Sequence, residues 1–254
     1  MELHNQIILV TGAASGMGLA TALHVKALGA RVVALDFNEH ELQKSAEQHG
    51  FYGVAADISQ AVSLEQAFHR IQSDVGVPRA VVHCAGIVDS ARAVSKQGPQ
   101  TLARFQKVID VNLIGTFNVL RLSAAALMTE EPLNDDGERG VIIMTASVAA
   151  FEGQIGQLAY SASKGGVVAM TLPAAREFGP FGIRVMTIAP GIIKTPMMAS
   201  LPPEVEQRLS AELPFPKRLG HAAEFAQLVQ HMIENRYLNG EVIRLDAALR
   251  MAAK

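Results

Sequence analysis

The sequence predicts an α/β fold in which a doubly wound, seven-stranded parallel sheet carries helices on both faces. Two observations carry this prediction. Short apolar runs rich in β-branched residues alternate with longer stretches of helical period, which is the pattern of βαβ units. No linker-like stretch divides the 254 residues, so we expect a single domain spanning residues 1–254.

Seven runs are predicted as strands because each is short and apolar almost throughout. These runs are Ile7–Thr11, Arg31–Asp36, Tyr52–Ala56, Ala80–Cys84, Val141–Ala146, Arg184–Ala189 and Val242–Leu245. The helical stretches between them are Gly18–Leu28, Ser63–Ser73, Thr101–Met128, Leu158–Phe178 and Ala222–Glu234. The acidic, turn-rich segment Thr129–Gly140 is expected to be an exposed loop.

The charge balance and the cysteine count exclude several classes of partner. The chain carries 22 basic and 24 acidic residues, so its totals show neither a nucleic-acid footprint nor a polybasic membrane surface. The single cysteine, Cys84, excludes an internal disulfide and forms no metal-ligand cluster with the scattered histidines. We therefore expect a small organic substrate, with no metal, nucleic acid or membrane as partner.

The start of the chain and its cysteine use predict a location. The first predicted strand begins almost at Met1, which leaves no room for a leader segment ahead of the fold. No later segment is expected to reach the length of a transmembrane span. A lone thiol fits a reducing compartment, so we expect a cytoplasmic protein.

A glycine-rich turn follows the first strand and opens a helix. Glycines there let the backbone turn tightly and approach the pyrophosphate of a dinucleotide, which the helix N-terminus stabilises. The predicted contacts are Gly12, Ser15, Gly16, Met17 and Gly18. The alternative is that these glycines mark a tight strand-to-helix turn and nothing more.

The second strand ends at Asp36, where the adenosine ribose of a dinucleotide would lie. A carboxylate there accepts hydrogen bonds from the 2′- and 3′-hydroxyls and repels a 2′-phosphate, which favours NAD over NADP. No arginine or lysine lies in the glycine-rich turn or directly after Asp36. The alternative is that Asp36 caps the following helix.

Further candidate cofactor contacts follow the third and fourth strands. Asp57 and Ile58 come at the edge where an adenine would sit, although Asp57 could instead be an N-cap. In His83-Cys84-Ala85-Gly86, the small residues allow close approach to the adenosine side of the ligand. Cys84 is expected to be a packed small hydrophobe, because no activating base lies at motif spacing.

Ser147, Tyr160 and Lys164 are the candidate catalytic residues. Ser147 follows the fifth strand, and Tyr160 and Lys164 share a helix face, although such a pair is also common by chance. Hydride transfer at an alcohol carbon must be matched by proton transfer at its oxygen, and a phenol is a poor base at neutral pH. We expect the Lys164 ammonium and a positive nicotinamide ring to lower the pKa of Tyr160, while Ser147 holds the substrate oxygen.

Together these residues make the chain similar to the short-chain dehydrogenase/reductase family, which has a Rossmann fold, along nearly its whole length. The matching motifs are Thr11-Gly12-x-x-x-Gly16-x-Gly18, Asp36, Asp57, Ala85-Gly86, Asn112, Ser147, Tyr160-x-x-x-Lys164 and Pro190-Gly191. One departure is His83-Cys84-Ala85-Gly86, where the family usually has Asn-Asn-Ala-Gly.

The resemblance implies a role for each matching residue. Tyr160 would be the acid/base, Lys164 would also bind the nicotinamide ribose, and Asn112 would help to hold a water behind Lys164. The implied cofactor contacts at the nicotinamide end are Pro190, Gly191, Ile193 and Thr195, the last two at the carboxamide.

A closer resemblance, carried by residues 139–154, 159–166, 184–191 and 238–246, is to one branch of this family. That branch oxidises short-chain 3-hydroxyacyl-CoA thioesters with NAD and forms homotetramers, which implies an acyl-CoA substrate and a homotetramer here. The predicted helices Thr101–Met128 and Leu158–Phe178 also carry more apolar residues than one sheet face needs, as expected for a subunit contact.

Substrate choice is expected to depend on two segments in which the chain departs from that branch, Asp89–Gln100 and Lys194–Leu213. We expect a substrate lid around residues 193–215. Gln154, Gln157 and Phe151 are expected to line the approach to Tyr160, with packing before the helix as an equal alternative.

The sequence thus predicts an NAD-dependent oxidoreductase that interconverts a secondary alcohol and a ketone. A 3-oxoacyl carrier-protein reductase or a hydroxysteroid dehydrogenase remains an alternative, because the same catalytic group serves both. A non-catalytic NAD-binding regulator is an alternative of another class. Such proteins usually lose the tyrosine or the lysine, and both are present here.

Overall fold

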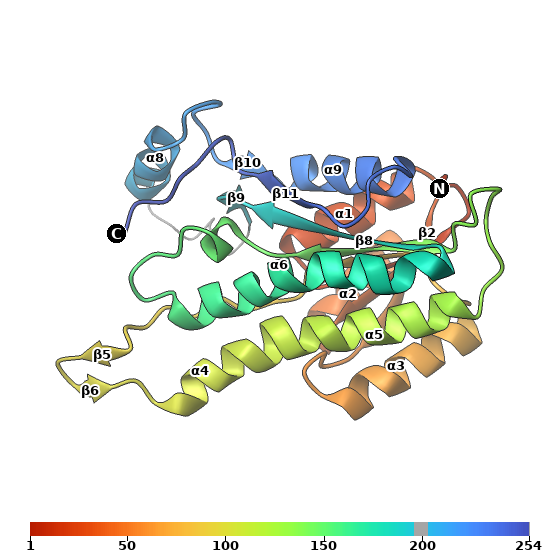
Figure 1. Ribbon diagram of the computed structural model, residues 1–254, viewed down its shortest axis with the longest axis horizontal. Coiled ribbons are helices and arrows are strands. Elements are labelled where there is room, and N and C mark those ends of the chain that lie inside the picture. The colour runs from red at the N-terminus through yellow and green to blue at the C-terminus, as the bar shows by residue number, and fades with distance from the viewer. Residues whose placement is uncertain (196–202, 254) are drawn as a thin grey trace.

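The computed structural model of the protein describes residues 1–195 and 203–253 (Figure 1). Its centre is a seven-stranded sheet of order β11-β8-β7-β4-β1-β2-β3, in which every neighbouring pair is parallel. The strands are β1 (Ile7–Thr11), β2 (Arg31–Asp36), β3 (Tyr52–Ala55), β4 (Ala80–His83), β7 (Gly140–Thr145), β8 (Ile183–Pro190) and β11 (Val242–Leu245). All seven predicted strands are confirmed.

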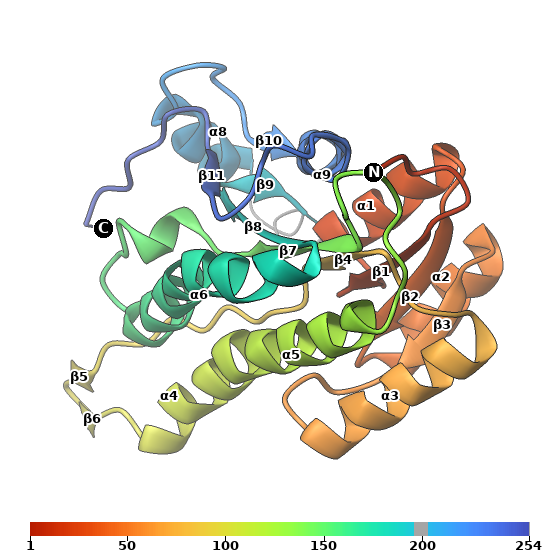
Figure 2. The same ribbon diagram turned by 45° about the vertical axis from the view of Figure 1, so that its right-hand side comes forward.

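Helices cover both faces of this sheet, as predicted (Figure 2). One face carries α1 (Gly16–Ala27), α2 (Glu39–His49) and α9 (Ala222–Glu234). The other carries α3 (Ala61–Asp74), α4 (Leu102–Ile109), the π-helical turn η1 (Asp110–Ile114), α5 (Gly115–Met128) and α6 (Leu158–Phe178). Along β1, Ile8 and Val10 pack toward the first set and Leu9 toward the second, because successive side chains of a strand point to opposite faces.

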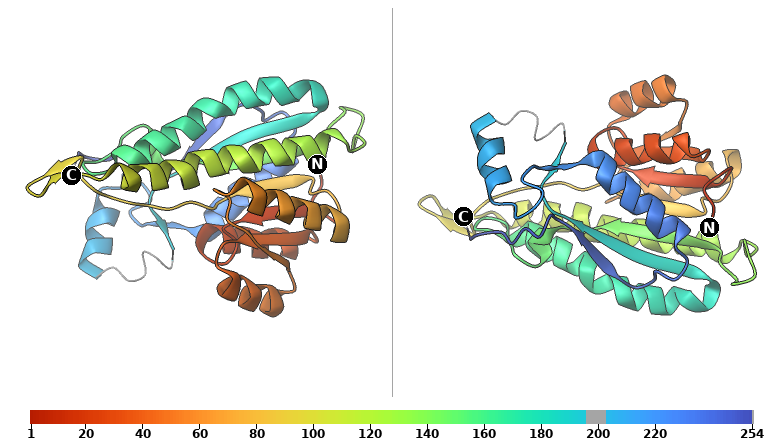
Figure 3. Two further views of the ribbon diagram at one scale, coloured as in Figure 1. Left: turned by 90° about the horizontal axis from the view of Figure 1, so that it is seen from below. Right: turned by 90° about the horizontal axis from the view of Figure 1, so that it is seen from above.

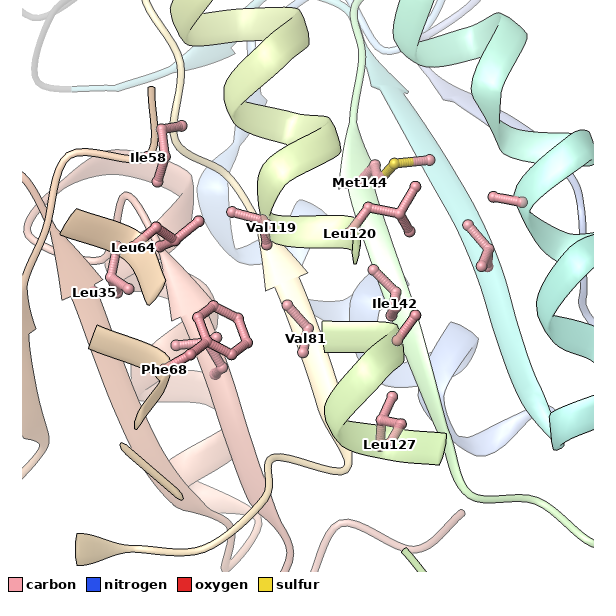
Figure 4. Packing of buried hydrophobic residues seen from close by; sticks show 14 of the residues in the cluster. Leu35, Ile58, Leu64, Phe68, Val81, Val119, Leu120, Leu127, Ile142 and Met144 are labelled. Carbon is pink, nitrogen blue, oxygen red and sulfur yellow. The ribbon is translucent and has the colours of Figure 1, made fainter. Parts of the chain in front are cut away.

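Figure 4 shows the core under α3 and α5. Phe68 of α3 and Leu127 of α5 lie in it, together with Ile142 of β7. Burial of an apolar side chain of this size stabilises the fold by roughly 1.5–3 kcal/mol. Such packing holds α5 firmly against the sheet, and with α5 the π-helical turn that precedes it.

The direction in which the sheet grows reverses between β1 and β4. From β1 the chain adds β2 and β3 toward one edge, and from β4 it adds β7, β8 and β11 toward the other. The chain therefore leaves β1 toward α1 on one face of the sheet and leaves β4 toward α4 and α5 on the other. Open α/β sheets bind their ligands at this point.

Helix α2 is absent from the prediction made from the sequence. Its buried side chains are few, chiefly Leu42, so the segment shows little apolar periodicity. Local signals at its ends define it instead. The Asn38 side chain accepts a hydrogen bond from the Glu41 N–H, and Gly50 ends the helix in a left-handed conformation with φ of 66°.

The predicted helix Thr101–Met128 is a continuous helical segment, Leu102–Met128, with the π-helical turn inside it. Its 27 residues are long and apolar enough, by length and composition, to cross a membrane. The expectation that no segment reaches such a length is therefore wrong. More than half of its most apolar stretch is buried, and Val119 and Leu120 belong to the core against the sheet.

The segment Thr129–Gly140 is only partly exposed. Glu138 is buried, and its carboxylate accepts hydrogen bonds from Arg184 Nε and Nη2 at 3.1 and 2.9 Å. Arg184 is itself buried at the start of β8, and a buried guanidinium requires such a partner. The prediction of an exposed loop is therefore wrong at Glu138.

Smaller elements surround the sheet, most of them at its carboxyl edge, while η3 precedes the start of β8. The hairpin of β5 and β6 projects from one end of the molecule in both views of Figure 3. Strand β9 pairs with β10, and α8 lies between them in the chain. The bounds are β5 (Val94–Ser95), β6 (Gly98–Pro99), η2 (Val148–Ala150), η3 (Gly179–Phe181), β9 (Ile193–Lys194), α8 (Pro203–Ala211) and β10 (Gly220–His221).

Candidate active site

The glycine-rich turn leaves β1 at the switch point of the sheet. A Cβ atom on Gly12 would lie 2.8 Å from the backbone nitrogen of Ala85, and one on Gly18 would lie 2.1 Å from the carbonyl oxygen of Gly12. Gly12 and Gly16 also have φ of +67° and +57°, a region that disfavours side chains. The turn therefore requires glycine for its own packing, whether or not a ligand binds.

The start of α1 provides a separate reason to expect an anion there. Ser15 is the N-cap residue, but its side chain makes no capping hydrogen bond among the described residues, and the first turn contains no acidic side chain. The first N–H groups of a helix lack partners within the helix and carry partial positive charge. Ser15, Gly16, Met17 and Gly18 are thus arranged to fit a pyrophosphate.

Asp36 is directly connected to this turn. The residue is nine-tenths buried at the end of β2, where its Oδ2 accepts a hydrogen bond from the Ala14 N–H and its Oδ1 one from the Asn38 N–H, both at 3.1 Å. Asn38, not Asp36, is the N-cap of α2, so the capping alternative for Asp36 is wrong. Each carboxylate oxygen keeps a lone pair for a ribose hydroxyl.

Asp57 and Ile58 are used by the fold itself. Asp57 is exposed, and its Oδ1 accepts hydrogen bonds from the N–H and the hydroxyl of Ser59 at 2.9 and 2.7 Å. Ile58 belongs to the core, and its carbonyl oxygen accepts a hydrogen bond from Asn118 Nδ2 at 3.0 Å. Their contact with an adenine stays a prediction.

The segment after β4 lies beside the glycine-rich turn, as the Gly12–Ala85 approach shows. Burial raises the pKa of the Cys84 thiol to about 12, which agrees with a packed residue and not a nucleophile. A Cβ atom on Gly86 would lie 3.1 Å from Asn112 Oδ1 and 3.5 Å from Lys164 Nζ. Gly86 therefore keeps open the space in front of these two side chains.

Ser147, Tyr160 and Lys164 are brought together at the carboxyl end of β7. Ser147 is the N-cap of η2, and its hydroxyl accepts a hydrogen bond from the Ala149 N–H at 3.1 Å. Tyr160 lies in the first turn of α6, and Lys164 Nζ is 5.9 Å from the centre of its ring. Lys164 is buried, and its ammonium donates a hydrogen bond to the carbonyl oxygen of Thr145 at 2.7 Å.

The charge states in this cluster are set mainly by burial. Burial lowers the pKa of Lys164 to about 8. Burial also raises the pKa of Tyr160 above its usual value, and a hydrogen bond with Ser147 acts in the opposite direction. In the chain alone burial therefore dominates and favours the neutral phenol, while the expected lowering of the Tyr160 pKa by Lys164 together with a bound nicotinamide ring stays a prediction.

Asn112 lies in the π-helical turn and is fully buried. Its Oδ1 accepts a hydrogen bond from the Ile87 N–H, and its Nδ2 donates to the Ile87 carbonyl oxygen, both at 2.8 Å. Nδ2 also lies 3.2 Å from Ser163 Oγ, a contact that the sequence did not suggest. The amide therefore holds the loop after Gly86, and its role in retaining a water stays a prediction.

The predicted nicotinamide contacts come from the end of β8 and from the residues that follow it. Thr195 Cγ2 would be 3.6 Å from a Cβ atom on Gly16, which places Thr195 beside the start of α1. Ile193 is buried in β9, Pro190 ends β8, and Gly191 packs closely against Asp246. Of the predicted lid, residues 196–202 lie outside the described residues.

Gln154 and Gln157 are engaged within their own loop. Gln157 Oε1 accepts a hydrogen bond from the Gln154 N–H at 2.9 Å, and Gln154 Nε2 donates to the Ala252 carbonyl oxygen at 3.1 Å. Phe151 is half exposed, with the Arg244 guanidinium 5.1 Å from its ring centre. These contacts favour the packing alternative, while a contact with substrate stays a prediction.

Comparisons with known proteins find similarity along nearly the whole chain. The family described as short chain dehydrogenase matches residues 6–206. The 3-hydroxyacyl-CoA dehydrogenase type-2 of Bos taurus is 50% identical over 249 residues, covering 96% of this chain and 95% of the bovine protein. The Drosophila melanogaster protein of the same name is 47% identical over 251 residues, covering 97% and 98%. The crystal structure of 3-hydroxyacyl-CoA dehydrogenase type-2 from Mycobacterium avium is 40% identical, with a TM-score of 0.93 and coverage of 100% of this chain and 98% of that one.

Proposed function

This chain belongs to the short-chain dehydrogenase family, and on that premise we propose that it interconverts a short-chain 3-hydroxyacyl-CoA and its 3-oxoacyl-CoA. It is an oxidoreductase that uses NAD. The observation that carries the proposal is the meeting of Ser147, Tyr160 and Lys164 beside Gly86 and the glycine-rich turn. Their presence together argues against a non-catalytic NAD-binding regulator.

The cofactor site fits NAD in two respects. The uncapped start of α1 suits the pyrophosphate, and Asp36 has one free lone pair on each oxygen for the ribose hydroxyls. The same carboxylate repels a 2′-phosphate, which supports NAD over NADP. In this proposal Lys164 binds the nicotinamide ribose.

The catalytic side chains divide the chemistry at the substrate oxygen. In alcohol oxidation Tyr160 accepts the hydroxyl proton, while Ser147 hydrogen-bonds the same oxygen and orients it. When bound, NAD supplies the acceptor for the hydride and a positive ring that favours the phenolate. Since burial alone raises the pKa of Tyr160, we expect efficient proton abstraction only in the complex with oxidised cofactor.

The acyl-CoA substrate is supported by the names of the relatives that are about half identical over nearly the whole chain. Residues 193–215 serve as the substrate lid in this proposal. In the described part of that segment, Leu213 packs with Val148, which directly follows Ser147. Movement of the lid would thus displace a residue that neighbours Ser147.

The protein acts as a homotetramer in the cytoplasm in this proposal. Three large apolar side chains stay about half exposed along η1, α5 and α6, namely Ile114, Phe117 and Leu172, and they would be covered in a subunit contact. The lone thiol of Cys84 fits a reducing compartment. Sedimentation analysis tests the assembly, and a monomer at micromolar concentration would contradict it.

Replacing Tyr160 with phenylalanine tests the mechanism. Tyr160→Phe removes only the hydroxyl that transfers the proton, so turnover of acetoacetyl-CoA with NADH should fall roughly 100- to 10,000-fold. NADH binding should persist. The matched control is Tyr237→Phe, because Tyr237 is 99% exposed. Near-normal turnover by Tyr160→Phe would show that the assigned mechanism is wrong.

A substrate panel separates the acyl-CoA proposal from its alternatives. The wild-type enzyme is assayed with acetoacetyl-CoA, an acetoacetyl carrier protein and a ketosteroid, each with NADH and NADPH. The proposal expects the highest kcat/KM with acetoacetyl-CoA and NADH. A clear preference for the carrier protein with NADPH, or for the steroid, would replace the substrate while leaving the oxidoreductase chemistry in place.

A further inference from the structure

His83 is a buried polar side chain that the proposed reaction does not use. It is the last residue of β4, is 1% exposed, and follows the apolar pair Val81 and Val82 in that strand. Both ring nitrogens have partners. Nδ1 lies 2.7 Å from Thr11 Oγ1, at the start of the glycine-rich turn, and Nε2 lies 3.0 Å from Thr116 Oγ1, in the first turn of α5.

The surrounding hydrogen bonds decide which nitrogen carries the proton. The Thr116 hydroxyl lies 2.6 Å from the carbonyl oxygen of Asn112, and two oxygens approach so closely only with a hydrogen between them. The Thr116 hydrogen is therefore donated to Asn112. Its oxygen can then only accept from His83, so Nε2 must carry the hydrogen.

The other side of the ring follows from this assignment. A neutral imidazole with hydrogen on Nε2 presents a lone pair on Nδ1, which accepts the Thr11 hydroxyl hydrogen. The Thr11 oxygen in turn accepts a hydrogen bond from the Ala85 N–H at 3.2 Å. Every donor and acceptor is thereby satisfied, and all links point the same way, from the Ala85 N–H to the Asn112 carbonyl oxygen.

This chain of hydrogen bonds joins the two halves of the site. Its first part touches the glycine-rich turn and the segment after β4, which approach each other most closely at Gly12 and Ala85. Its last part ends on Asn112, whose side chain fixes Ile87 and contacts Ser163 on the catalytic helix. No direct hydrogen bond between Thr11 and Asn112 occurs in the described structure, so His83 bridges the gap.

We propose that His83 is a positioning residue which, as the neutral Nε2–H tautomer, couples the glycine-rich turn to Asn112. The role of each end, cofactor binding and catalysis, rests on the function proposed above. The coupling works through orientation, since His83 reaches Asn112 only through Thr116 and the glycine-rich turn only through the Thr11 hydroxyl. Removing it frees Thr11 and Thr116 to seek other partners and lets the two halves of the site move independently.

The electrostatic setting agrees with a neutral ring. Burial, with a smaller contribution from the Lys164 ammonium, lowers the pKa of His83 to about 3. The neighbouring Cys84 thiol is neutral as well, because burial raises its pKa. His83 should therefore hold one tautomer across the whole working pH range.

The tautomer is tested by nitrogen NMR on protein labelled with ¹⁵N-histidine. The chain has eight histidines, and the spectrum of His83→Leu identifies which signals belong to His83. We expect an unprotonated Nδ1 and a protonated Nε2 that do not change between pH 5 and 8. A protonated Nδ1, or a ring that titrates in this range, would overturn the proposal.

The coupling is tested by variants that cut the chain at different points. Thr116→Val should lower kcat about tenfold with little change in the Kd of NADH, and Thr11→Val should mainly weaken NADH binding by a similar factor. His83→Leu should do both. His83→Gln keeps one acceptor and one donor and should recover part of each loss.

Thr171→Val is the matched control. Thr171 also donates to the carbonyl oxygen four residues earlier in its helix, and its hydroxyl also meets a buried partner, Thr187 Oγ1, at 2.7 Å. This variant should lose thermal stability to a similar extent but keep kcat and the Kd of NADH. Equal kinetic losses in Thr171→Val and Thr116→Val would reduce His83 to a structural role and overturn the proposal.

NADH binding and the NMR signals do not depend on which substrate is correct. If wild-type protein failed to turn over acetoacetyl-CoA, the function proposed above would fail, while the tautomer and the binding losses of Thr11→Val and His83→Leu would still decide the coupling. Wild-type kinetics and binding in His83→Leu would overturn the coupling and leave the enzymatic function intact.

Discussion

The glycine-rich turn and the expected substrate entrance, which is the loop Asp89–Gln100 with residues 203–224, are held in different ways. In the turn, backbone packs against backbone so closely that a single added carbon on Gly18 would lie 2.1 Å from an oxygen. At the expected entrance, ion pairs between partly or largely exposed side chains join neighbouring segments, among them Arg104 with Asp89 and Arg218 with Glu224. The close contacts at Gly18 leave no room for a larger residue. Exposed ion pairs contribute little to stability, so their residues can be replaced.

This difference explains why one scaffold keeps its chemistry while its substrates vary. The turn requires glycine at Gly12 and Gly18 for its packing, so a change there is expected to disturb the fold together with the cofactor site. The entrance can exchange its exposed pairs at small cost to stability, and this freedom lets new substrates be accommodated. The following predictions test the contrast, from the largest expected effect to the smallest.

Gly18→Ala should give the largest effect. The new methyl group would collide with the Gly12 carbonyl oxygen, so we expect a loss of stability of several kcal/mol, about 3 or more, and no measurable NADH binding. Chemical denaturation and NADH fluorescence measure the two effects. Gly179→Ala is the control, because its φ is −53° and no heavy atom lies within 4 Å of the added carbon. If both variants behaved alike, steric limits would not define the turn.

Lys164→Met should stabilise the fold while abolishing activity. The pKa of Lys164 is about 8 in the folded state against an ordinary 10.5, so between these values the unfolded state binds more protons and wild-type stability rises with pH. Below pH 8 the full cost of the buried charge is present. We expect a gain of about 1–3 kcal/mol at pH 7, reduced because Thr145 loses its donor, that disappears toward pH 10.5.

Denaturant titrations of wild-type and Lys164→Met proteins at pH 7 and pH 10 measure this difference. Lys164→Arg is the control, because it retains a charge at both values of pH. A Lys164→Met protein that is less stable than the wild type at pH 7 would contradict the idea that the catalytic charge is held there at a cost.

Arg218→Ala should give the smallest effect. Arg218 and Glu224 are 43% and 37% exposed, so their two hydrogen bonds of 2.8 and 2.9 Å are screened by water. We expect a loss of less than about 1 kcal/mol, which shrinks further at high salt, and an unchanged Kd for NADH. Thermal melts at two salt concentrations test this. A loss as large as that of Gly18→Ala would erase the contrast between the two regions.

The sequence predicted the parts of the fold in which residues close together in the chain follow a simple pattern. The strands are continuous apolar runs, and the i, i+4 spacing of Tyr160 and Lys164 leaves little freedom in their relative placement. Helix α2 was missed because it buries few apolar side chains and is defined by its caps. The ion pair of Glu138 with Arg184 joins residues 46 positions apart, which no local pattern reveals.

The sequence predicted where the site residues lie, but not their pKa values or their long-range hydrogen bonds. Ser147, Tyr160 and Lys164 were placed correctly at one edge, yet the raised pKa of Tyr160 in the chain without cofactor was not predicted, because burial is a property of the folded chain. His83 was noticed only as a departure from a motif. Its two threonine partners come from positions 72 residues before it and 33 residues after it, so its part in the site appears only in three dimensions.

The π-helical turn Asp110–Ile114 changes the direction in which the two parts of one long helix face. An extra residue in a turn rotates everything beyond it by roughly 100° about the helix axis. The two ends of the helix can thereby face different neighbours, with α4 packed on α6 and α5 packed on α3 and β7. Deleting one residue from this turn would rotate α4 away from α6 while α5 kept its contacts with α3 and β7. The expected substrate entrance would then lose its structure while the core stayed packed.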